Sequence, residues 1–427
     1  MRFGQDLERS SSSRDSEVKG IASGQPHQGK IVHVFFKGRV YLVGVSSLRT
    51  MPLRRLLALI AGSVGIVGGG TAIALAGGDR PLPPPKALAV AIHDAATAPA
   101  VDGITARIRL TNHLIDSSSV QGSDPLLSGA TGRLWASSDH RVRLELQSDS
   151  GDVQIVSDGT TLTVYDATMN AVYRADLPKK SGRADSNNGA PPTLATIESD
   201  LSKIAEHWNL SSAQPDSVAG RPAYSVRISP KRHGGLLGAA ELAADASTGV
   251  PLRAAVFANG DSSPVLELEV TDISYGKVDG SVFDVRPPAD AKVTDLTSRQ
   301  QPAAGRDAAA KSVPFTVSAP ATLAGMARSE LRTVGPADHP AALVTYGTGL
   351  GGIAVLEQAA DPGAQTPTKP QEGQAGVSLP TVSIRGIQGQ ELETALGTIV
   401  RFTRAGVTYT VAGSVPVAVA EAAARGL

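Results

Sequence analysis

Alternating apolar and polar residues dominate the chain beyond residue 100. In residues 104–110 every second residue is aliphatic or alanine, and the residues between them are threonine or arginine. Residues 140–147 repeat the pattern, with charged side chains around Val142, Leu144 and Leu146. Such alternation predicts strands of an antiparallel sheet that has one buried face and one solvated face.

Turn signals separate these strands from one another. Asp158-Gly159 joins two short apolar strands and is a strong hairpin signal. A further turn at 167–170 leads into the next strand. Later strands are predicted at residues 223–229, 240–246, 252–259 and 265–271. We expect the strands between residues 104 and 176 to form an antiparallel meander, in which consecutive strands are neighbours.

Two helices accompany the predicted strands, one before the first strand and one between the earlier and the later strands. Residues 86–98 place Leu88 and Ile92 on one face at helical spacing. A polar loop at 179–192 precedes the second helix, whose apolar stripe we expect to cover the sheet as a lid. The lid candidates are Leu194, Ile197, Leu201 and Ile204.

The in-facing positions of the strands are the candidate ligand-binding residues. A sheet with only two helices can bury its inner face in a packed core or line a gap beneath the helices, and the pattern leaves both arrangements open. A register slip of one residue would expose the whole apolar set. The candidates are Ile104, Ile108, Val142, Leu144, Leu146, Leu162, Val164, Val226 and Ile228.

A smaller unit is predicted at 314–427, after an Ala- and Gln-rich linker at 298–313. We expect it to be α+β, with helices at 321–331 and 416–425. Residues 347–352 formally match GxGxxG, but a strand rather than a helix follows them, which favours a hairpin loop over a dinucleotide site. Its strands are predicted at 342–346, 353–358, 382–387, 398–404 and 407–413.

An export segment precedes the sheet. Residues 56–78 carry no charge and follow two arginines, which should stay cytoplasmic. The segment at 51–80 is either a signal peptide cleaved near Ala76 or a retained transmembrane anchor. Both alternatives place the later residues outside the cytoplasm. Met51 is the better start for such a segment, so residues 1–50 are interpreted as a mis-assigned upstream extension or a disordered tail.

Composition excludes several kinds of chemistry. The chain of 427 residues has 40 basic and 40 acidic residues and no cysteine. The neutral balance gives no electrostatic basis for binding nucleic acid. The lack of cysteine excludes thiolate nucleophiles, disulfides and iron–sulfur clusters. The 8 histidines are scattered, and no HExxH or GxSxG motif is present. No metal, cofactor or catalytic residue is predicted, and we expect a binding protein rather than an enzyme.

The turn motifs resemble those of the bacterial lipoprotein-carrier (LolA-like) superfamily, which includes RseB-like and LppX-like proteins. They occur in the order that is typical of that superfamily and together cover about 86–297. The motif residues lie at 156–166, 170–174, 218–224, 245–253 and 282–288.

This resemblance implies the fold and the ligand. The expected fold is α+β: an unclosed antiparallel half-barrel with a helical lid, followed by the smaller domain. The expected function is to hold an acyl chain of a lipid or lipoprotein in envelope lipid carriage. The alternative is an RseB-like regulatory module that contacts a membrane-embedded protein such as an anti-sigma factor. A retained membrane anchor would be unlike the soluble carriers.

Overall fold

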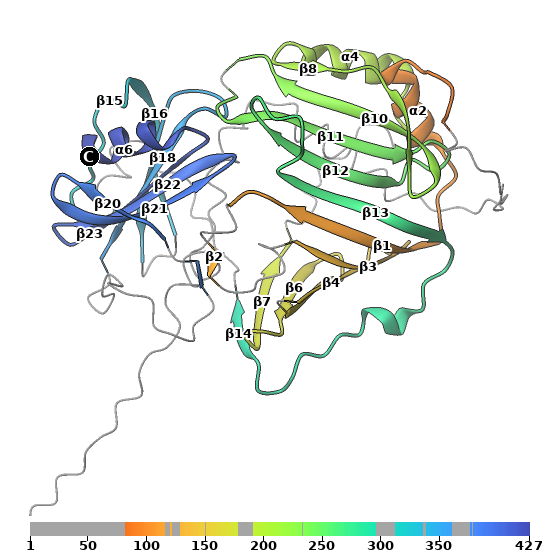
Figure 1. Ribbon diagram of the computed structural model, residues 1–427, viewed down its shortest axis with the longest axis horizontal. Coiled ribbons are helices and arrows are strands. Elements are labelled where there is room, and N and C mark those ends of the chain that lie inside the picture. The colour runs from red at the N-terminus through yellow and green to blue at the C-terminus, as the bar shows by residue number, and fades with distance from the viewer. Residues whose placement is uncertain are drawn as a thin grey trace, which may run out of the picture.

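Two antiparallel sheets make up the architecture of the protein (Figure 1). The computed structural model describes residues 82–115, 120–121, 129–149, 151–177, 191–232, 234–295, 312–335, 339–360, 376–377 and 379–427. The predicted export segment, most of the loop at 179–192 and most of the linker at 298–313 lie outside these residues. Among the helices that the structure describes, none has the length and hydropathy needed to cross a membrane.

The first sheet has 13 strands in the order β14-β7-β6-β5-β4-β3-β1-β13-β12-β11-β10-β8, with β9 also paired to β10. Only the β14–β7 pair is parallel among these strands. The end strands β14 and β8 are not paired with each other, so the sheet is an unclosed half-barrel, as predicted. Its strands are β1 (Gly103–Asn112), β3 (Ala130–Ser137), β4 (Val142–Ser148), β5 (Gly151–Ser157), β6 (Thr161–Asp166), β7 (Ala171–Asp176), β8 (Trp208–Leu210), β9 (Gln214–Val218), β10 (Arg221–Pro230), β11 (Leu237–Asp245), β12 (Pro251–Ala258), β13 (Leu266–Tyr275) and β14 (Lys292–Asp295).

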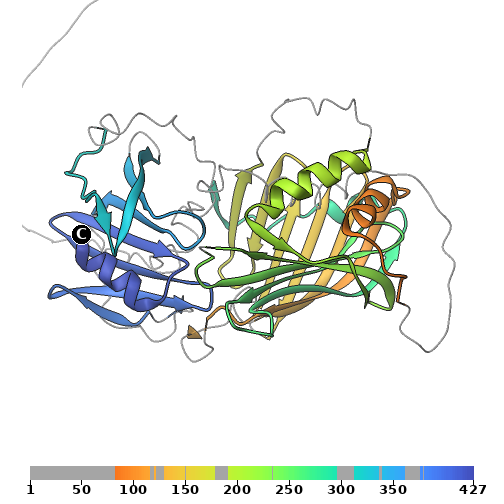
Figure 2. The same cartoon turned by 90° about the horizontal axis from the view of Figure 1, so that it is seen from above.

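Two helices pack on each other next to the first sheet. They are α2 (Leu88–Thr97) and α4 (Leu194–Ala205), and both lie at the end formed by β8 and β10 (Figures 1 and 2). Thr193 caps α4, because its hydroxyl accepts a hydrogen bond from the Thr196 amide. A short 3₁₀ helix, η5 (Gly280–Phe283), follows β13.

The second sheet has 8 strands in the order β15-β16-β17-β18-β23-β22-β21-β20. The C-terminal helix α6 (Val417–Gly426) was predicted, and it packs its alanines on this sheet. A two-stranded sheet pairs β2 (Val120–Gln121) with β19 (Gly376–Val377). The strands of the second sheet are β15 (Thr322–Leu323), β16 (Met326–Val334), β17 (Ala341–Tyr346), β18 (Ile353–Ala359), β20 (Thr381–Ile384), β21 (Ile387–Thr394), β22 (Gly397–Arg404) and β23 (Val407–Gly413).

The helix predicted at 321–331 is wrong, because this segment forms β15, a turn and most of β16. Ala324 and Gly325 have φ of 46° and 78°, values that an α-helix does not contain. Along β16 the side chains alternate in exposure as far as the buried Leu331. The loop at 347–352 is a hairpin connection between β17 and β18, as predicted.

Candidate ligand-binding face of the first sheet

The strand register places every predicted ligand-binding residue on one face of the first sheet. Residues that pair directly across antiparallel strands share a face. One such line runs from Ala106 through Leu134, Leu144 and Ile155 to Val164. The candidates on β1, β4 and β6 lie on the same side as this line, because each is an even number of residues from a member of it.

A second line of pairs crosses the other half of the sheet. Leu110 pairs with Leu268, Leu268 with Ala254, Ala254 with Leu242, and Leu242 with Val226. We call these residues the apolar row. It joins the first line through β1, where Ala106 and Leu110 share a face. Val226 therefore lies on the same face as the candidates on β1, β4 and β6. Ile228 shares this face, because it lies two residues further along the same strand.

Burial divides the candidates into two groups. Ile104, Ile108 and Leu146 are buried in a cluster that also contains Leu252 and Val270, so this part of the face is a packed core. Ile228 is also buried. The remaining candidates are half-buried: Val142, Leu144, Leu162, Val164 and Val226.

The apolar row is the more open part of the face. Leu268 is 36% exposed, which is unusual for a leucine on the apolar side of a sheet. Its neighbour Ala254 is exposed, and Leu110, Leu242 and Val226 are half-buried. The structure therefore combines the two arrangements that the sequence left open. The face is a packed core around β1 and is accessible across β10 to β13.

The helix α4 covers one end of this face. Ile204 is buried in a cluster with Trp208 and Ile228, and Ile228 belongs to the candidate face. Ile197 is buried as well, and Leu201 is half-buried. Leu194 is 37% exposed, so the predicted stripe contacts the protein only along part of its length.

The opposite face of the same strands carries paired charges. Arg253 donates to Asp216 at 2.8 Å and to Glu241 at 2.7 Å, and Glu267 lies 3.9 Å away. Burial raises the pKa of Asp216, but hydrogen bonds from Ser225 and the charge of Arg253 outweigh it and leave that pKa lowered. Burial, together with the nearby charge of Glu269, raises the pKa of Glu267.

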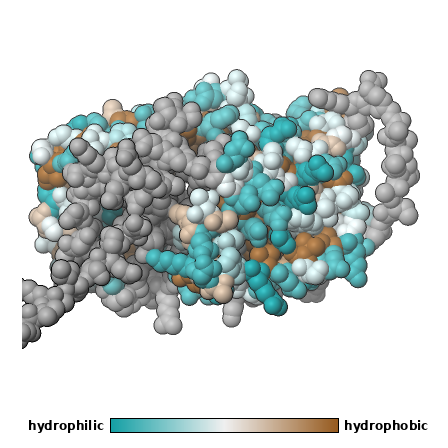
Figure 3. Space-filling model, turned by 60° about the horizontal axis from the view of Figure 1, so that its bottom comes forward, coloured by the Kyte–Doolittle hydropathy of each residue, from teal (hydrophilic) through white to brown (hydrophobic). Residues whose placement is uncertain are grey.

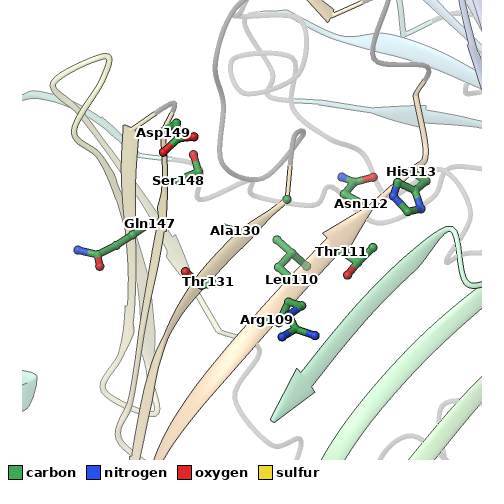
Figure 4. A pocket seen from close by; sticks show the side chains of 11 residues that line it. Arg109, Leu110, Thr111, Asn112, His113, Ala130, Thr131, Gln147, Ser148 and Asp149 are labelled. Atoms are coloured by element: carbon green, nitrogen blue, oxygen red, sulfur yellow. The ribbon is translucent and has the colours of Figure 1, made fainter. Parts of the chain in front are cut away.

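A pocket of about 390 Å³ lies beside Leu110, at one end of the apolar row (Figure 4). Leu110 and Ala130 contribute its apolar lining. Its polar lining comes from the ends of β1, β3 and β4 and the residues next to them: Arg109, Thr111, Asn112, His113, Thr131, Gln147, Ser148 and Asp149. Hydrophobic side chains on the face shown in Figure 3 form small patches among polar ones.

Several residues of the open part were missing from the sequence-based candidates. They are Leu110, Leu242, Ala254 and Leu268. The signal for Leu268 was present, since Leu266, Leu268 and Val270 alternate with two glutamates. The strand pairing that brings it next to Leu110 joins residues far apart in sequence. Within the described ranges, no group of three or more His, Asp or Glu side chains is placed to hold a metal ion.

A family model described as "Predicted periplasmic protein (DUF2092)" matches residues 112–184. No curated protein matches the sequence. Among solved structures, the Pseudomonas aeruginosa MucA/MucB complex is similar with a TM-score of 0.38 and 19% identity, over 79% of this chain and 94% of the matched chain.

Two further solved structures are also similar to this chain. A LolA superfamily protein from Nitrosomonas europaea has a TM-score of 0.22 and 10% identity, over 47% of this chain and 98% of its own. A putative outer membrane lipoprotein-sorting protein domain from Vibrio parahaemolyticus has a TM-score of 0.19 and 10% identity, over 46% of this chain and 96% of its own. These similarities are too distant to transfer a site or an activity. The LolA superfamily, to which the Nitrosomonas europaea structure is assigned, is also the superfamily that the turn motifs resemble.

Proposed function

We propose that the first sheet holds the acyl chain of a lipid or lipoprotein along the apolar row, and that the protein is a non-enzymatic binding protein of the cell envelope. The observation that carries this proposal is the row itself. Leucine, valine and alanine side chains cross five neighbouring strands and remain accessible, next to a part of the same face that is packed.

The size of the row suits such a ligand. Four strand spacings from Leu110 to Val226 correspond to about 19 Å, enough for the extended chain of a common fatty acid. Burial of an acyl chain contributes about 0.8 kcal/mol per methylene group. Affinity therefore requires no charged group on this face, and the ion pairs of Arg253 with Asp216 and Glu241 lie on the other face.

The remaining parts of the chain fit the same proposal. Residues 86–297 are the binding domain with α4 as its lid, and residues 298–313 link it to a second domain at 314–427. The segment at 51–80 directs export, either as a cleaved signal or as an anchor that keeps the later residues on the outer side of the membrane.

A charge placed in the row tests the proposal. Leu268→Asp should weaken saturable binding of a fluorescent fatty acid by the purified chain at least about tenfold, because the ligand would desolvate a carboxylate. Thr271→Asp is the matched control, since Thr271 is exposed on the same strand. Equal affinity of both variants and the unmodified chain would contradict the proposal, and the alternative of a protein-interaction module would replace it.

A further inference from the structure

The lid cluster of the first sheet receives a side chain from the second sheet. Leu350, in the hairpin loop between β17 and β18, packs against the cluster formed by Ile204, Trp208 and Ile228. Gly347 and Gly349 in this loop have φ of 77° and 70°, which residues with side chains rarely adopt. The glycines thus allow a tight loop that carries one large apolar residue to the end of α4.

A second contact lies nearby, in the connection between β10 and β11. The backbone amide of Leu236 donates to two atoms of Ser414. They are the carbonyl oxygen, at 3.2 Å, and the hydroxyl oxygen, at 3.0 Å. Gly235 makes this approach possible. A Cβ atom on Gly235 would lie 2.0 Å from the Ser414 carbonyl oxygen, so any other residue would push the two sheets apart. The next residue, Leu237, packs against the same lid cluster as Leu350.

Both contacts bear on the same end of α4. Ile204 lies in its last turn, and the Ala205 carbonyl accepts a hydrogen bond from the Lys231 side chain. If α4 moves away from the sheet, Ile204 leaves the cluster on which Leu350 packs. Movement of the lid therefore changes the contact with the second sheet, and a change at that contact alters the stability of the closed lid.

We propose that the second sheet acts as a latch on the lid helix, with Leu350 and the Gly235–Ser414 contact as its two points of attachment. In this arrangement the second sheet controls how often the face beneath α4 opens. The latch would regulate the site of the proposed function and rests on that function for its biological role. Its physical basis, the coupling of α4 to the second sheet, can be measured without any ligand.

Hydrogen exchange of the full chain tests the latch directly. Truncation of a partly buried leucine removes contacts that stabilise the closed state, and it should raise the equilibrium constant for local opening about tenfold. Leu350→Ala should therefore speed exchange in residues 194–208 about tenfold. Leu82→Ala, which truncates an exposed leucine, should leave the exchange of this segment unchanged.

A second pair of variants tests the other point of attachment. Gly235→Ala should speed exchange in residues 194–208, because its methyl group cannot fit against Ser414. Gly260→Ala is the matched control, since Gly260 also has a positive φ, 90°, but no neighbour within 4 Å of the added carbon. If Leu350→Ala also loosened β17 and β18, the comparison of Gly235→Ala with Gly260→Ala would decide whether α4 is coupled to the second sheet.

The two proposals fail separately. Unchanged exchange of residues 194–208 in both Leu350→Ala and Gly235→Ala would overturn the latch, whatever the protein binds. Faster exchange in these variants, together with no saturable fatty-acid binding by the unmodified chain, would support the latch and reject the proposed function.

Discussion

The carboxylate of Glu357 in β18 accepts a hydrogen bond of 2.9 Å from the backbone amide of Ser318, in the segment that precedes β15. Glu357 is fully buried, and its other carboxylate oxygen has no hydrogen-bond partner in the structure. Burial raises the pKa of Glu357 to about 7, and the amide of Ser318 and the charge of Arg404 offset only part of this effect.

This relationship predicts that the protein loses stability as the pH rises. Between the ordinary pKa of 4.5 and the raised value, the folded chain holds a proton that the unfolded chain releases. The contribution of protonated Glu357 to the free energy of unfolding is complete below pH 4.5 and is lost as the pH rises through 7. The loss is on the order of 3 kcal/mol.

Urea unfolding at pH 5 and pH 8 measures this effect. Glu357→Gln keeps an acceptor for the Ser318 amide but cannot ionise, so it should show a smaller decrease in the free energy of unfolding between these pH values. If the mutant and the unmodified chain lose equal stability, Glu357 is not the group responsible.

Arg253 is predicted to stabilise the first sheet through its carboxylate partners. Arg253→Met leaves Asp216 partly buried without its cation and leaves Glu241 with Arg227 alone, at 3.5 Å, which should cost roughly 1–3 kcal/mol of unfolding free energy. Arg109→Met is the matched control, because the Arg109–Glu269 pair spans 3.9 Å and Arg109 is exposed. Its loss should cost less than about 1 kcal/mol. Similar losses in both variants would show that the partners of Arg253 add no stability of their own.

The half-buried Leu201 is predicted to contribute to both lid stability and binding. Leu201→Asp places a carboxylate at a half-buried position of α4, and we expect both a lower unfolding free energy and weaker fatty-acid binding. Ser202→Asp is the control, because Ser202 is exposed on the neighbouring position of the same helix. Thermal unfolding and probe titration measure the two effects. Normal stability and binding in Leu201→Asp would show that Leu201 makes no contribution to the lid.

Much of the fold follows from local patterns. The phase of each strand could be predicted because Arg, Glu, Thr or Ser flanks nearly every in-facing aliphatic residue, so only one register buries the apolar set. The loop around Gly349 could be predicted as a hairpin because a strand follows it. The helix predicted at 321–331 failed because Gly325 adopts a positive φ, which ends any helix there.

The open part of the site depends on long-range pairing. Leu110 and Leu268 meet only because β13, far along the chain, pairs with β1. No local pattern distinguishes Ile108, which is packed in the core, from Leu268, which is accessible. The contact of Leu350 with the lid cluster is equally invisible in sequence, because it depends on how the two sheets dock.

Photo-crosslinking with a diazirine-labelled fatty acid is the most direct test of the central claim, since peptide mapping shows where the chain binds. The proposal predicts adducts on the peptides of the apolar row, at Leu110, Val226, Leu242, Ala254 and Leu268. An excess of unlabelled fatty acid should abolish these adducts. Adducts confined to other surfaces, or adducts that unlabelled fatty acid does not displace, would contradict the claim that the apolar row holds an acyl chain.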